Sequence, residues 1–140
     1  MPDEISTRCA TIEECYEFML AYAGQGLSGN EGSLSSGEVR DYLHRAVEAL
    51  SGLAEAYAAA VKERNLQPAE TYHAFLAVLE RDARDSLAAI QLVLAQTILS
   101  SQLIDNLNAS IHLRALLTDL FLVDEILKPQ RMQAKPVTTS

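Results

Sequence analysis

Apolar residues recur at alternating steps of four and three from residue 39 to residue 60, and this spacing limits the chain to helical folds. The positions are Val39, Leu43, Ala46, Leu50, Leu53, Tyr57 and Ala60. Such a seam is typical of a helix that packs at a shallow angle against its neighbours. The following segment continues the spacing through Tyr72, Leu76, Leu79, Ala83, Ile90 and Val93. Two long amphipathic helices are therefore predicted.

Start and stop signals divide the chain into four predicted helices, at about residues 12–23, 36–65, 68–96 and 101–128. Thr11 and Glu14 form a capping box before the first, Ser100 or Ser101 caps the last, and Pro129 is expected to end it at Lys128.

The segments outside these helices are polar or rich in Gly and Ser. We expect residues 1–10 to be flexible, residues 27–37 to form a long loop, and residues 129–140 to be a disordered tail. Alternation of period two, the mark of a strand, is absent. The predicted fold is all-α, an antiparallel four-helix bundle with up-and-down topology over residues 11–128 and a long loop between its first two helices.

Composition bounds the classes of partner. The chain has 140 residues, enough for one domain with its own core, and 19 acidic against 11 basic residues give a net charge of -8. This balance repels phosphate backbones and disfavours nucleic acid as a partner. No segment approaches the ~20 apolar residues of a membrane span, so no membrane partner is expected. Cys9 and Cys15 follow no secretory leader, so we expect free thiols in a reducing cytoplasm.

The last predicted helix is apolar around most of its circumference in its second half. The residues concerned are Leu113, Leu116, Leu117, Leu120, Phe121, Val123 and Leu127. A helix that is apolar on most sides needs more than one partner surface, so it lies at the centre of the fold or at a subunit interface. Each helix of a four-helix bundle keeps a solvent side, and we therefore predict that these seven residues form the interface of an isologous homodimer.

Two acid-x-x-His motifs, residues 41–44 and 70–73, have the spacing that di-metal sites in helical bundles use. The seam assignment turns Asp41 away from the core. A rise of about 1.5 Å per residue separates His44 from His73 by roughly 20 Å along the bundle axis. The residues of both motifs are therefore expected at the protein surface, each motif near the start of a helix. The remaining candidate for a metal site within one chain combines Glu17, His44 and His112, and its metal would be iron, manganese or zinc.

A polar stripe crosses the most apolar helix at Asp105, Asn108, His112 and Asp119, spaced by three, four and seven. Buried polar groups are costly unless they find partners. One interpretation is a proton-transfer or ligand-binding site built on His112. The alternatives are a hydrogen-bonded layer that fixes helix register and a stripe that faces solvent.

No nucleophile is accompanied by a base. Cys15 falls on the apolar face of its predicted helix and is expected to be buried, whereas Cys9 is expected to be exposed. The sequence therefore favours an accessory or regulatory protein that acts through protein contacts, without a cofactor. The alternative is a carboxylate and histidine metalloprotein with oxidative or hydrolytic activity.

Overall fold

The computed structural model describes residues 4–24 and 36–134, and within them it describes the side chains of residues 4–24 and 37–127. These residues form six helices and no strand, which confirms the all-α prediction. The helices are α1 (Glu4–Gly24), α2 (Ser36–Ser51), α3 (Leu53–Glu63), α4 (Ala69–Leu94), α5 (Ser101–Ala109) and α6 (Ile111–Ala134). Most of residues 27–37, the predicted loop, lies outside the described residues.

Helix α1 begins well before the predicted start at residue 12. Ile5 and Cys9 are buried, so they extend the apolar face of the helix toward its N-terminus and make residues 4–10 part of the packed fold. The prediction that Cys9 is exposed is wrong. Thr11 lies inside the helix, where its hydroxyl donates to the carbonyl of Thr7 at 3.0 Å, and the proposed capping box is not formed.

The second predicted helix is divided into α2 and α3 at Gly52, which has φ −118° and ψ 11°. Every residue of the seam predicted across this break is buried, so the interruption preserves the apolar face. Arg8 of α1 covers the break. Its guanidinium donates to the carbonyls of Glu48 and Ala49 at 2.9 and 3.0 Å, and it pairs with Glu4 at 2.8 Å.

The last predicted helix is likewise divided, into α5 and α6, at Ser110, whose ψ of 145° is extended. Ser100 caps α5 as predicted, accepting from the Leu103 N–H at 3.1 Å, and the Ser110 hydroxyl accepts from the Leu113 N–H at 3.3 Å. Pro129 does not end α6, which continues to Ala134. Proline removes one backbone hydrogen bond, and here this loss does not stop the helix. Of the predicted tail, residues 135–140 lie outside the described residues.

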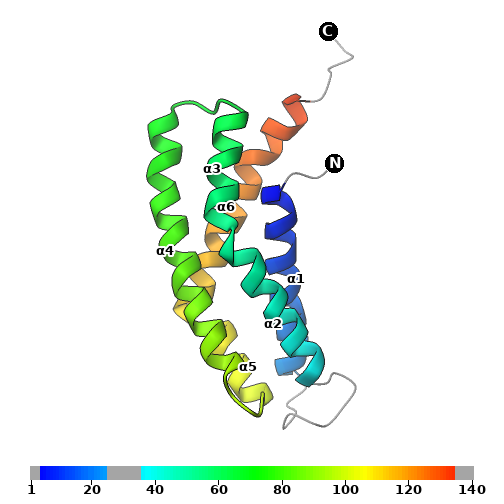
Figure 1. The fold of residues 1–140 in the computed structure, drawn as a ribbon. Coiled ribbons are helices and arrows are strands. Elements are labelled where there is room, and N and C mark those ends of the chain that lie inside the picture. The colour runs from blue at the N-terminus through cyan, green and yellow to red at the C-terminus, as the bar shows by residue number, and fades with distance from the viewer. Residues whose placement is uncertain (1–3, 25–35, 135–140) are drawn as a thin grey trace.

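The core lies between α1, α4 and the helices that both of them contact. Helix α1 packs against α2, α3, α5 and α6, and so does α4, but α1 and α4 do not pack against each other. Figure 1 shows the α3–α4 connection, the start of α1 and the second half of α6 at one end of the molecule, and α5 at the other. Among the helices that the structure describes, none has the length and apolar character needed to cross a bilayer.

Hydrogen bonds from side chains tie the end of α4 to the first part of the chain. The guanidinium of Arg40 donates to the carbonyls of Leu94, Gln96 and Thr97, and the Tyr22 hydroxyl donates to the carbonyl of Leu99 at 2.5 Å. These carbonyls belong to the end of α4 and the connection to α5, where the helix itself supplies no donors. The connection is thereby fixed without a glycine cap.

Gly52→Ala tests the role of Arg8 at the α2–α3 break. A Cβ atom at residue 52 would lie 2.6 Å from the Arg8 guanidinium carbon, so Arg8 must leave both carbonyls. We expect the free energy of unfolding to fall by about 1–2 kcal/mol, the value of charged hydrogen bonds of this kind.

Chemical denaturation of a double-mutant cycle measures this coupling. The double variant with Arg8→Ala should be little worse than Arg8→Ala alone. Gly24→Ala is the matched control, because a Cβ atom there meets no neighbour within 4 Å. Fully additive losses would show that Arg8 does not act through the break.

Candidate functional site

The residues of the predicted metal site are not brought together. Glu17, His44 and His112 lie on α1, α2 and α6, and all three side chains are exposed. Asp41 and His73 are exposed as well, in agreement with the surface positions expected for the two acid-x-x-His motifs. Within the part of the chain that the structure describes, no group of three or more His, Cys, Asp or Glu side chains has the arrangement of a metal site.

The predicted dimer interface is largely part of the core of a single chain. Of its seven residues, only Phe121 is exposed, at 58%, and the other six are buried. The reason is that α6 packs against α1, α4 and α5, so several neighbours cover its circumference. The alternative considered for this helix, a central position in the fold, is the correct one for Leu113, Leu116, Leu117, Leu120, Val123 and Leu127.

A second row of residues on α6 faces outward, and we call it the outer stripe. It consists of Arg114, Thr118, Phe121 and Glu125, which are all exposed and are spaced by four, three and four. Leu122 and Ile126 flank it and are 48% and 47% exposed. Large apolar side chains thus remain in solvent on the outer side of a helix whose inner side fills the core.

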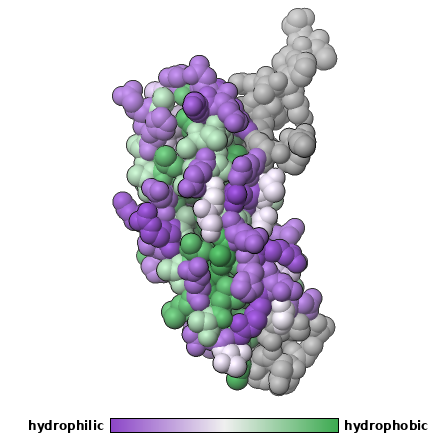
Figure 2. Space-filling model, in the orientation of Figure 1, coloured by the Kyte–Doolittle hydropathy of each residue, from purple (hydrophilic) through white to green (hydrophobic). Residues whose placement is uncertain are grey.

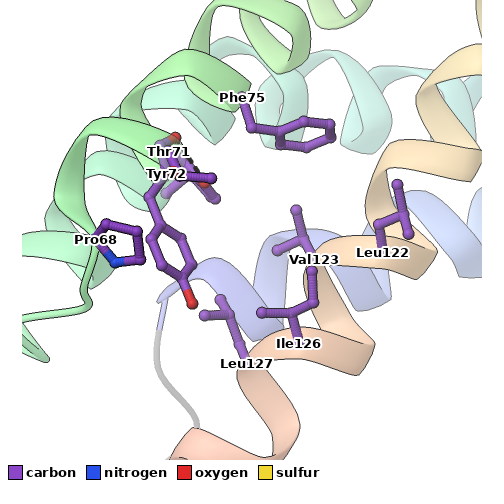
Figure 3. A pocket seen from close by; sticks show the side chains of 9 residues that line it. Pro68, Thr71, Tyr72, Phe75, Leu122, Val123, Ile126 and Leu127 are labelled. Atoms are coloured by element: carbon purple, nitrogen blue, oxygen red, sulfur yellow. Dashed lines mark hydrogen bonds between the residues drawn. The ribbon is translucent and has the colours of Figure 1, made fainter.

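A groove of about 320 Å³ lies beside the outer stripe, between α6 and the first half of α4. Figure 3 shows side chains from the two helices facing each other across it. Its walls are Tyr57, Pro68, Thr71, Tyr72, Phe75, Leu122, Val123, Ile126 and Leu127. None of these described lining residues is charged, so the groove suits apolar groups.

Tyr57 fixes the α4 wall of this groove. Its hydroxyl donates to the carbonyl of Tyr72 at 2.8 Å, and its ring meets that of Phe75 edge-on with the centroids 6.3 Å apart. Burial raises the pKa of Tyr57 to about 12, with a smaller contribution from Tyr72. The hydroxyl therefore remains a donor throughout the physiological range.

Polar groups cross the seam between α4 and α6 farther along. The Ser86 hydroxyl donates to the carbonyl of His112 at 2.9 Å. Asp119 is only 6% exposed and meets the carboxyl of Asp82, which is half-buried on α4. Burial, the hydrogen bond with Asp82 and the charge of Asp82 raise the pKa of Asp119 to about 7. Sequence reasoning missed Asp82, although it follows the buried Leu79 by three residues.

The predicted polar stripe is not continuous. Asp105 and His112 are exposed, whereas Asn108 and Asp119 are buried. The extended residue Ser110 breaks the helix between them, so a spacing counted along one continuous helix does not apply. His112 contributes its backbone carbonyl to the α4–α6 seam, and its exposed imidazole does not form the buried site considered from the sequence.

The cysteines do not form a nucleophilic centre. Neither forms a disulfide among the described residues, and both are buried. Burial raises the pKa of Cys15 to about 12, although the charge of Arg45 acts in the opposite direction. The reactive thiolate form is therefore scarce at neutral pH. Among the described residues, the features left as candidates for function are the apolar surface on α6 with its groove and the carboxyl pair of Asp82 and Asp119.

Comparisons with protein families, with curated proteins and with solved structures find no match for this chain.

Asn108→Leu tests the cost of the buried amide on α5. Both polar atoms of Asn108 are buried and have no hydrogen-bond partner among the described residues. Leucine has a similar size and no polar atom, so we expect the free energy of unfolding to rise by about 1–2 kcal/mol.

His112→Leu is the control, and its effect should stay within about 0.5 kcal/mol, because His112 is exposed. Thermal and chemical denaturation provide the measurement. A destabilised Asn108→Leu variant would show that the amide has a partner that leucine cannot replace.

Proposed function

We propose that the protein is an accessory or regulatory helical bundle that acts through protein contacts, beginning with a homodimer formed by the outer stripe. One observation carries this proposal: α6 is apolar on two sides, and only one of them is used within the chain. The exposed side holds Phe121, and the exposed Leu122 and Ile126 border it. Aromatic and large aliphatic residues that cluster on an exposed helix are typical of interaction surfaces.

The spacing of the outer stripe favours a helix as its partner. Steps of four, three and four keep residues on one line along a helix that crosses another at a shallow angle. The inner side of α6 follows the same rule and packs in this way against its own chain. A second copy of α6 supplies the same spacing and a matching length.

Charge complementarity favours an antiparallel pair. When two α6 helices pack about a two-fold axis, one register pairs all four stripe positions at once. Arg114 then faces the partner's Glu125, Thr118 faces the partner's Phe121, and symmetry repeats both pairs. The positions of Thr118 and Phe121 lie nearest the axis in this arrangement, where interface residues contribute most, and Phe121 is the large apolar one.

The groove adjoins this interface. Leu122 and Ile126 belong both to the flank of the outer stripe and to the groove wall. A second copy seated on α6 would therefore also cover the open side of the groove. This continuity extends the apolar surface beyond three side chains and supports the proposed dimer.

We also propose that the six helices act as four rods, α1, α2–α3, α4 and α5–α6, in an antiparallel up-and-down bundle. The packing supports this, because each rod contacts two neighbours and not the rod diagonal to it. We place the protein in the reducing cytoplasm, since neither cysteine forms a disulfide among the described residues and both are buried.

Phe121→Asp tests the dimer. A buried aromatic anchor replaced by a charge should weaken association at least a hundredfold, or about 2.7 kcal/mol. Size-exclusion chromatography with light scattering over a range of micromolar concentrations gives the association constant.

Leu92→Asp is the matched control for Phe121→Asp. Leu92 is 67% exposed and lies at the end of α4, at the other end of the molecule from the second half of α6 (Figure 1). The Leu92→Asp variant should leave the association constant unchanged. A wild-type protein that is monomeric at these concentrations would contradict the proposal.

A charge exchange tests the register. Arg114→Glu should weaken the dimer by bringing like charges together, and the double variant Arg114→Glu, Glu125→Arg should restore much of the loss. Because both residues are exposed, neither change should disturb the fold of the single chain. If Phe121→Asp abolishes the dimer and both charge variants leave it unchanged, the outer stripe is supported as the interface and the antiparallel register is contradicted.

A further inference from the structure

Two carboxyl groups meet between α4 and α6, and among the described residues no cation is paired with either of them. Asp119 projects from α6 into the interior and meets the carboxyl of Asp82 on α4. Two ionised carboxylates do not form a hydrogen bond with each other, whereas a carboxylic acid donates to a carboxylate. A hydrogen bond between these two carboxyl groups therefore needs one proton on the pair.

The surroundings of Asp119 offer no other means of satisfying it. Its Oδ2 atom is fully buried, and no N–H or hydroxyl of the described residues donates to it. One turn before and after Asp119 on α6, the positions nearest its face hold Ala115, Leu116, Leu122 and Val123, all without polar side chains. The Ser86 hydroxyl, one turn from Asp82 on α4, is already engaged with the carbonyl of His112.

Charged groups on the other elements packed against α6 do not neutralise the pair. On α4, the neighbouring Arg81, Arg84 and Asp85 are exposed. On α1, Glu13 interacts with Asp124 and with its own neighbour Glu17, and the pKa of Glu13 is raised by burial first and then by these two charges. On α5, Asp105 is exposed. Of the charged groups named on α1, α4 and α5, only the carboxyl of Glu13 is partly buried, and the two arginines stay in solvent.

We propose that Asp82 and Asp119 form a proton-sharing latch between α4 and α6, which holds the two helices together most strongly at acidic pH and weakens as the pH rises toward neutrality and the proton is lost. The latch does not rest on the dimer proposed above, because both of its carboxyl groups belong to a single chain. The latch binds a single proton, and this proton determines how strongly α4 and α6 are held together.

The direction of the pH dependence follows from the protonated state. The pKa of Asp119 is about 7 in the folded chain against an ordinary value of 3.8, so between these values the folded chain holds a proton that the unfolded chain releases. The stabilisation is complete below the lower value and is lost as the pH rises through the higher one. Above it, two negative charges face each other, one on a buried and one on a half-buried side chain.

Asp119→Asn is the decisive variant, because an amide imitates the neutral acid and donates to Asp82 at every pH. We expect the ratio of the wild-type to the variant unfolding constant to rise by roughly tenfold per pH unit between pH 5 and pH 7, then to level off. Urea denaturation from pH 5 to pH 8.5 measures this ratio. Asp85→Asn, an exposed change on α4, is the control and should show no such trend.

Carboxyl carbon-13 NMR of the wild-type protein gives a direct reading that does not depend on a variant's folding. One aspartate should titrate near neutral pH, and that signal should disappear in Asp119→Asn. In Asp82→Asn the remaining carboxyl should titrate at lower pH than in the wild type, because the facing charge is gone. A pH-independent ratio of unfolding constants, together with aspartates that all titrate below pH 5, would overturn the proposal.

Discussion

The packing of α6 against α1, α4 and α5 determines where everything else on this molecule lies. Burial of its inner side removes six large aliphatic residues from solvent and so supplies much of the driving force for the fold. The same packing brings Asp119 into the interior and leaves Phe121 outside, because residues two apart on a helix point in very different directions. The buried acid and the exposed aromatic ring are therefore consequences of one helix placement.

Polar side chains compensate for interruptions that this packing requires. The break at Gly52 leaves carbonyls at the end of α2 without helical partners, and Arg8 satisfies two of them. Arg40 does the same for the end of α4. In both places an arginine from a distant part of the chain replaces the local glycine cap. Helix ends that are closed in this way couple secondary structure to tertiary contacts, which a pattern of apolar residues does not reveal.

Apolar periodicity was sufficient to predict the helical class, the buried seam across residues 39–60 and the cap at Ser100. It failed where a small perturbation interrupts a helix while its apolar spacing continues, as at Gly52 and Ser110. It also failed at residues 4–10, where Ile5 and Cys9 are isolated apolar residues in a polar segment. For the candidate site, residues of α6 were identified, but their division into inner and outer sides depends on the direction of three neighbouring helices. The contact with Asp82 could not be predicted, because it depends on the register between α4 and α6.

Asn108 and Asp119 are buried to nearly the same extent, but their chemistry differs in what can relieve the burial. Neither amide atom of Asn108 has a hydrogen-bond partner among the described residues, and an amide cannot change its protonation state to adapt. Asp119 can take up a proton, which removes its charge and creates a donor for Asp82 in one step. A buried amide of this kind is a constant cost at every pH, whereas the cost of a buried acid beside a second acid grows as the pH rises from its ordinary pKa to its raised one. Of these two groups, Asp119 is therefore the one whose burial makes the packing of α6 dependent on pH.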